Sequence, residues 1–284
     1  MNWHNFERTK YFVLAFGASF LALLTLALCM AAFVNKEKPP VEELKAIPAD
    51  EYYTPRREDS LNIMLAVCDD AGTPYSFFLV GINAMRGEIP VAVFTPQALV
   101  KSNEIMLTLG EVYTKNGAMA AKLALGEVLE ITVHRSLSFT EENFINAIDI
   151  IGAVEYNFEE LPYAAWDGEN PVAGRQLLDG SRLYKLLCVG AAGVDSAELL
   201  AYYINSSLKN ILRSDADEVF RKVINLADGD VSFNDYDSRR ELLTFLSKLS
   251  GNHARSVMVR GVWNDKNVLQ LSSSLSEIFG KMYG

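Results

Sequence analysis

Two adjacent carboxylates, Asp69 and Asp70, are the side chains of this sequence best placed to do chemistry. They lie in "CDDAG" (68–72), directly after an apolar segment that has the composition of a strand. Sheets of α/β proteins often place ligands just beyond the end of such a strand. Paired carboxylates can hold Mg²⁺ together with substrate phosphates, but aspartates are also common turn formers. The spacing alone leaves both a metal site and a structural turn open.

A second segment that could border a ligand site is "LLDGSRLYKLLCVG" (177–190). Asp179 is a favourable N-cap residue, so a helix is predicted to start there. The last turn of this helix contains Cys188 and carries no charge. Arg182 and Lys185 lie earlier on the same helix and are expected to face solvent.

Familiar catalytic motifs are missing from the sequence, which has no Walker loop, no Gly-x-Ser-x-Gly elbow and no His-Glu-x-x-His motif. His134 and His253 are each expected to be surface residues or satisfied structural ones. "DGDVSFNDYD" (228–237) lacks the glycine and the final glutamate of an EF-hand loop at the required spacing. It predicts a polar turn that leads into a helix capped by Ser238.

The elements that must position these residues begin with strands. Short segments rich in β-branched and aromatic residues predict strands at 61–67, 75–82 and 89–94, the last two joined by a hairpin through Gly87. Helices and further strands follow, and together they predict an α/β domain with a mixed central sheet flanked by helices. The later predictions are a helix with a capping box at Ser138 and Glu141 and a stop at Gly152, a strand at 153–158, a helix at 196–214, a helix from Ser238 to Gly251 and a strand at 255–263.

The N-terminal region predicts a membrane anchor. Residues 11–34 are 24 residues without a charge, which corresponds to about 36 Å of helix against about 30 Å of hydrocarbon. A cleaved signal peptide is the competing interpretation, but its apolar region would run to only about 7–15 residues. Residues 1–10 then form a cytoplasmic tail and residues 61–284 an extracytoplasmic domain. Residues 35–60, charged and with four prolines, read as a stalk.

The formal net charge of −10 argues against a general nucleic-acid surface, so no nucleic-acid partner is expected. The partners that the sequence predicts are the cytoplasmic membrane, through the N-terminal helix, and an envelope protein or a glycan.

From Asn62 to about Trp263 the order of segments resembles the LytR-CpsA-Psr (LCP) family of cell-envelope phosphotransferases. "NIMLAVCD" resembles the family's opening strand, which ends in Gly-Val-Asp, and this places Asp69 on the family's aspartate. Later segments that resemble the family in the same order are "FFLVGINAMRGEIPVAVFTP", "AIDIIGAVEYNFEELPYA", "LLDGSRLYKLLCVG" and "GDVSFNDYDSRRELLTFLSKL".

The resemblance implies an α/β domain outside the cytoplasmic membrane that transfers a polyprenyl-pyrophosphate-linked glycopolymer to peptidoglycan. Arginines grip the pyrophosphate in that family, and acidic residues with Mg²⁺ assist the transfer. Here Cys188 and Gly190 stand where the family carries paired arginines, and Gln97 and Ala98 stand at an Arg-Asp pair. Tyr75 stands at an acidic position.

Of the charged residues that the family uses, only Asp69, together with Asp70, is retained. The candidate ligand-binding residues are therefore Asp69, Asp70, Gln97, Arg182, Lys185 and Cys188, with Asp69 the candidate for catalysis. The expected function is a non-catalytic binding or scaffold domain without a cofactor. An active phosphotransferase with Mg²⁺ on Asp69 and Asp70 is one alternative, and a sensor of a small neutral ligand is another. The resemblance also puts Cys68 near Cys188, which leaves a disulfide between them open.

Overall fold

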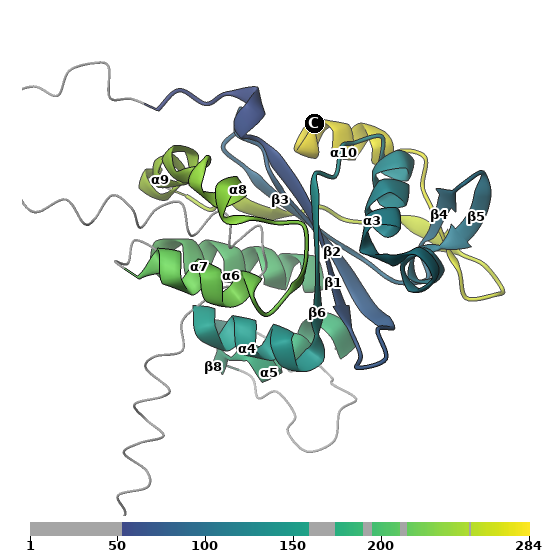
Figure 1. The fold of residues 1–284 in the computed structure, drawn as a ribbon, viewed down its shortest axis with the longest axis horizontal. Helices are drawn as coiled ribbons and strands as arrows, with labels where there is room; N and C mark the ends of the chain where they lie inside the picture. The colour runs from purple at the N-terminus through teal and green to yellow at the C-terminus, as the bar shows by residue number, and fades with distance from the viewer. Residues whose placement is uncertain (1–52, 159–173, 190–194, 211–214, 250) are drawn as a thin grey trace, which may run out of the picture.

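A six-stranded mixed sheet forms the centre of the computed structural model (Figure 1), which describes residues 53–158, 174–189, 195–210, 215–249 and 251–284. The strand order is β10-β3-β2-β1-β6-β9. β1 runs parallel to β6 and antiparallel to β2, and β3 runs antiparallel to β2 and parallel to β10. The strands are β1 (Leu61–Cys68), β2 (Pro74–Ile82), β3 (Ile89–Phe94), β6 (Arg135–Thr140), β9 (Asp228–Gly229) and β10 (Ala254–Ser256).

Both faces of this sheet are covered, so β1 is buried along its whole length. Ile63 and Leu65 point into one apolar cluster, and Met64 and Ala66 point into the other. The first cluster is covered by α4 (Glu141–Ile151), α5 (Gly180–Tyr184), α6 (Ser196–Asn210), α7 (Ala216–Ile224), α8 (Phe233–Asp237) and α9 (Arg240–Lys248). The second is covered by α3 (Leu109–Leu129) and α10 (Leu275–Tyr283). A strand buried on both faces explains why "LNIMLAVC" is a continuous apolar run and does not alternate with polar residues.

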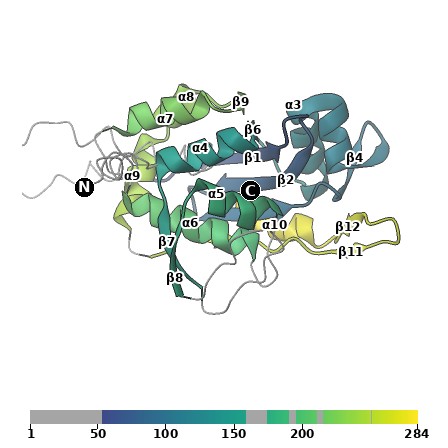
Figure 2. The same cartoon turned by 90° about the horizontal axis from the view of Figure 1, so that it is seen from below.

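Three small hairpins extend from this three-layer body (Figure 2). Their strands are β4 (Leu99–Ser102) with β5 (Ile105–Thr108), β7 (Val154–Phe158) with β8 (Gly174–Leu178), and β11 (Gly261–Trp263) with β12 (Leu269–Leu271). A π-helical turn, η4 (Lys185–Val189), continues α5. The central mixed sheet with flanking helices confirms the predicted fold class.

The predicted strands are confirmed to within one residue at each end for β1, β2 and β3. The hairpin between β2 and β3 closes through an Asn83–Glu88 bridge, with Gly87 at φ 63°. β7 confirms the strand predicted at 153–158. α6 confirms the helix predicted from Ser196 as far as Asn210, and residues 211–214 lie outside the described part.

Two predicted helix starts are wrong. Ser138 lies inside β6, where it pairs with Ala66, and Thr140 caps α4 instead. Gly152 ends that helix as predicted. Ser238 ends α8, so the predicted cap for the next helix is also wrong. The strong N-terminal cap in this region is at Ser232, because its hydroxyl accepts the Asp235 N–H while the Asp235 side chain accepts the Ser232 N–H.

The strand predicted at 255–263 is two separate strands. β10 pairs with only the first half of β3, and the last contact of this edge is the Val257 N–H on the Val91 carbonyl. The chain then leaves the edge of β3, and β11 pairs with β12 instead. The carboxyl-terminal half of β3 therefore has no neighbouring strand on that side among the described residues.

The predicted stalk at 35–60 is too long by at least its last eight residues, because the folded domain already begins at Tyr53. The Tyr53 ring packs on Phe245, with ring centroids 5.5 Å apart, and its hydroxyl donates to Asp59 at 2.6 Å. Asp59 is buried, and its carbonyl accepts from Arg239 at 3.1 Å. The predicted tail and membrane helix, residues 1–34, lie outside the described residues. None of the helices that are described is long and apolar enough to cross a membrane.

Two ion pairs hold the segment after α7 against β6 and α3. Lys122, almost fully buried on α3, contacts Asp230 at 2.7 Å, and Arg135 on β6 binds Asp235 through two nitrogens at 2.7–3.1 Å. Burial raises the pKa of each carboxyl group, but the hydrogen bonds from Lys122 to Asp230 and from Arg135 to Asp235 outweigh it. Both pKa values therefore lie below the ordinary 3.8.

The depressed pKa values predict a loss of stability in acid. A folded-state pKa below the unfolded-state value contributes stability that is present above about pH 4 and is lost as the pH falls through the folded-state value. We expect Asp235→Asn to lower the free energy of unfolding at pH 7 by about 1–3 kcal/mol and to flatten its decline below pH 4. Urea denaturation at several pH values measures both effects. Glu130→Gln, at an exposed position, is the control; an equally steep acid decline in Asp235→Asn would contradict the assignment.

A close helix contact predicts the effect of a single methyl group at Gly180. A Cβ there would overlap the carbonyl oxygen of Ile145 on α4 and lie 2.9 Å from Asp149 Oδ1. We expect Gly180→Ala to destabilise the protein by about 1–3 kcal/mol, as overpacking does. Gly280→Ala on α10 is the matched control, since no atom lies within 4 Å of the position that its methyl group would take and alanine favours helix. Equal unfolding midpoints in urea for the two variants would show that α4 and α5 are not in close contact.

Candidate functional site

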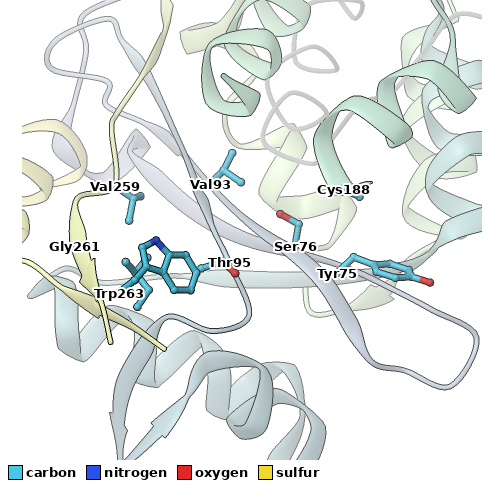
Figure 3. A pocket seen from close by; sticks show the side chains of 9 residues that line it. Tyr75, Ser76, Val93, Thr95, Cys188, Val259, Gly261 and Trp263 are labelled. Atoms are coloured by element: carbon cyan, nitrogen blue, oxygen red, sulfur yellow. The ribbon is translucent and has the colours of Figure 1, made fainter. Parts of the chain in front are cut away.

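A pocket of about 440 Å³ opens at the edge of the sheet where β3 ends and β2 begins (Figure 3). This is the edge at which β1 also ends, so the predicted location of a ligand site agrees with the geometry. The lining residues share one property, which is that none carries a charge. They are Tyr75, Ser76, Val93, Thr95, Cys188, Val259, Gly261, Trp263 and Leu269.

The start of β2 supplies one side of the pocket. The register of β1 and β2 shifts between Val67 and Cys68, and this irregularity lies opposite Tyr75. Tyr75 is exposed, and its ring meets the edge of Tyr184 at a centroid distance of 6.2 Å. The Tyr184 hydroxyl donates to Glu141 at 2.7 Å, and burial followed by this hydrogen bond raises the Tyr184 pKa far above its ordinary value. Tyr184 therefore keeps its proton and holds Tyr75 through ring packing.

The π-helical turn η4 supplies Cys188. Leu186 and Leu187 of this turn are buried in the core, which leaves Cys188 half-buried and facing the pocket (Figure 3). Burial, with smaller contributions from Glu141 and Cys68, raises the pKa of the Cys188 thiol well above its ordinary value. The thiol is neutral near pH 7, so it is a poor nucleophile and a poor metal ligand.

The hairpin β11–β12 forms the opposite wall and carries Trp263. Leu269 bridges to Ala98, and the Leu269 N–H donates to the Gln97 carbonyl at 3.0 Å. The Gln97 side-chain oxygen accepts a hydrogen bond from the Thr95 hydroxyl. Gln97 does not line the pocket itself, but it fixes two residues that do.

Asp69 and Asp70 lie beside the pocket and are not among its lining residues. Asp69 Oδ1 accepts the N–H groups of Ala71 at 2.9 Å and Thr73 at 2.7 Å, which closes the turn between β1 and β2. Asp70 is exposed. Within the described ranges no three His, Cys, Asp or Glu residues converge as a metal-binding group. The structural turn is observed, while Mg²⁺ binding by the two carboxylates stays a prediction.

The two basic residues predicted near the site do not line it either. The Arg182 guanidinium donates to the Leu177 carbonyl at 3.2 Å, and Lys185 is half-buried in η4. The predicted N-cap is confirmed, since Asp179 accepts the Arg182 N–H at 2.9 Å. Of the six predicted site residues the structure therefore places only Cys188 in the lining of this pocket, and Gly190 lies outside the described residues.

Trp263, Ser76 and Thr95 are lining residues that sequence reasoning did not identify. Trp263 was hidden inside a single predicted strand, and only the break after Val257 turns it toward β3. Ser76 and Thr95 lie at the ends of correctly predicted strands, so their position at the carboxyl edge of β3 was the usable signal.

The histidines behave as predicted. His134 Nδ1 accepts the Asn62 N–H at 2.9 Å, and its pKa is lowered, first by burial and then by neighbouring cations. His253 Nδ1 lies 3.0 Å from the Gly87 carbonyl oxygen. Both have structural partners.

Cys68 and Cys188 are both free thiols. Cys68 Sγ contacts the Tyr113 hydroxyl at 3.4 Å in the apolar cluster under α3, whereas Cys188 packs against the cluster on the other face. We therefore expect three alkylatable thiols, including Cys29, in the unfolded chain without reductant. Mass spectrometry after iodoacetamide treatment in urea measures this number. A count that rises only after reduction would demonstrate the disulfide that the sequence left open.

Comparison with known proteins supports the fold through structure alone. No protein-family model matches this chain, and no curated protein sequence is significantly similar to it. A putative transcription regulator from Eubacterium siraeum has a TM-score of 0.69 at 14% identity, over 86% of this chain and 98% of the other. TagV of B. subtilis has a TM-score of 0.56 at 13% identity, over 78% of this chain and 94% of the other.

A structure described as TagT bound to LI-WTA has a TM-score of 0.59 at 13% identity and covers 85% of this chain and 93% of TagT. TagT and TagV are LCP-family phosphotransferases. The resemblance found in the order of sequence segments is thus confirmed in three dimensions, and this chain has the fold of the LytR-CpsA-Psr proteins.

Proposed function

We propose that this protein is a divergent LCP-like protein of the cell envelope, anchored by residues 11–34, whose extracytoplasmic domain binds a ligand without transferring it. The fold shared with TagT and TagV supports the envelope assignment. The uncharged apolar segment at residues 11–34 supports the anchor. The lining of the pocket supports binding without transfer.

The observation that carries this proposal is the absence of any arginine or lysine among the residues that line the pocket. A pyrophosphate is a dense negative charge, and guanidinium groups bind such groups bidentately in family-type sites. Each missing charge-assisted hydrogen bond forfeits about 1.5–3 kcal/mol. Four missing contacts therefore amount to at least about 6 kcal/mol, or more than about a 10⁴-fold loss of affinity.

An active phosphotransferase is the second candidate, because Asp69 and Asp70 remain at the end of β1. Asp69 Oδ1 already accepts two backbone N–H groups, which leaves its other oxygen and Asp70 for a cation. A cation there would still lack basic partners for the phosphates among the pocket-lining residues. This candidate is therefore less well supported than binding alone.

A regulator that binds nucleic acid is not supported, although the E. siraeum protein is described as a putative transcription regulator. The formal net charge of −10 works against phosphate-backbone contacts, which require clustered lysine and arginine. A sensor of a small neutral ligand agrees with the same uncharged lining and differs from a scaffold only in the response that binding triggers.

The proposal predicts that the full chain does not cleave a polyprenyl-pyrophosphate-linked saccharide in the presence of Mg²⁺. TagT assayed in parallel provides the positive control, and release of polyprenyl phosphate is the measurement. Wild type and Asp69→Ala should both remain at background. Mg²⁺-dependent turnover that disappears in Asp69→Ala would replace the binding proposal with the phosphotransferase.

A further inference from the structure

The Ser76 hydroxyl is a buried hydrogen-bonding group that faces the pocket. Ser76 is 5% exposed, and its side chain is directed into the pocket in Figure 3. Among the described residues this hydroxyl has no hydrogen-bond partner. A buried hydroxyl without a partner is unfavourable, so a ligand that supplies one is stabilised at this position.

Trp263 presents an aromatic face at the same pocket. Its side chain is 52% exposed, although it belongs to a paired strand. The turn that comes next is rigid, because Asn264 Oδ1 accepts the N–H groups of Lys266 and Val268, each at 3.0 Å. An aromatic ring that is fixed in this way and still exposed is available for stacking.

The charges of the pocket restrict the chemistry of the ligand. Phosphate, carboxylate or ammonium groups would lose their hydration without gaining an opposite charge from the lining residues. A purely apolar ligand would leave the Ser76 hydroxyl buried without a partner. An uncharged polyhydroxylated ring meets both conditions, since its C–H face packs on an indole and its hydroxyls supply hydrogen bonds.

We propose that this pocket binds an uncharged saccharide, with one sugar ring stacked on Trp263 and one sugar hydroxyl bonded to Ser76. This inference rests on the proposed binding function and names the ligand class of the same pocket. A volume of about 440 Å³ lies within the range of small-ligand sites and accommodates a ring with part of its neighbour. Thr95, held by Gln97, offers a second hydroxyl on the Trp263 side.

Titration of the full chain in detergent with neutral trisaccharides tests the inference. Chitotriose, maltotriose and cellotriose are the probes, and calorimetry gives the affinity of each. We expect at least one to bind with a Kd below about 10 mM. Trp263→Leu and Ser76→Ala should each weaken that binding by about tenfold, whereas Trp263→Phe should weaken it less because it keeps an aromatic face.

Val262→Ala is the matched control, because Val262 lies on the same hairpin, is 73% exposed and does not line the pocket. It should leave the affinity unchanged. Unchanged thermal unfolding of each variant separates lost contacts from lost folding. Failure of all three trisaccharides to bind, insensitivity to both Trp263→Leu and Ser76→Ala, or tighter binding of glucose 1-phosphate would overturn the inference. Pyrophosphate cleavage is read out separately, so a failure of the proposed function remains distinguishable from a failure of the saccharide site.

Discussion

Burial of β1 on both of its faces is the constraint on which the rest of the fold depends. A strand without a solvent-facing side needs helices above and below it, and α4 to α9 on one face and α3 with α10 on the other meet this requirement. Because β1 pairs parallel with β6 and antiparallel with β2, its carboxyl end meets the start of β2 at one edge. The Asp69 turn and the pocket both follow from that arrangement.

The pocket owes its shape to an incomplete sheet edge. β10 accompanies β3 only from Ile89 to Val91, and the hairpin β11–β12 occupies the space that a longer strand would have filled. Trp263 and Leu269 thereby lie opposite Cys188, and the enclosed surface is polar without being charged. In a site of this kind hydrogen bonding and ring stacking decide what binds, and long-range electrostatic attraction contributes little.

The central strands and the nature of the site were predictable from sequence because each rests on local patterns. The apolar runs of β1 to β3 and the glycine at position 87 are such patterns, and so is the lack of charge around Cys188. The false cap at Ser138 shows the limit, since pairing with Ala66 overrides a favourable helix-start sequence. The wall carried by Trp263 depends on where β10 leaves β3, which is set by long-range pairing.

The packing of Tyr53 and Asp59 fixes where the polypeptide joins the folded body. Tyr53 to Ser60 lie before the first residue of β1, and the pocket lies beyond its last, so the eight residues of that strand separate the two. At about 3.3 Å per residue this is a separation of roughly 26 Å. A leash tethered to a bilayer at the near side would leave the mouth of the pocket pointing outward, toward whatever polymer lies above the lipid.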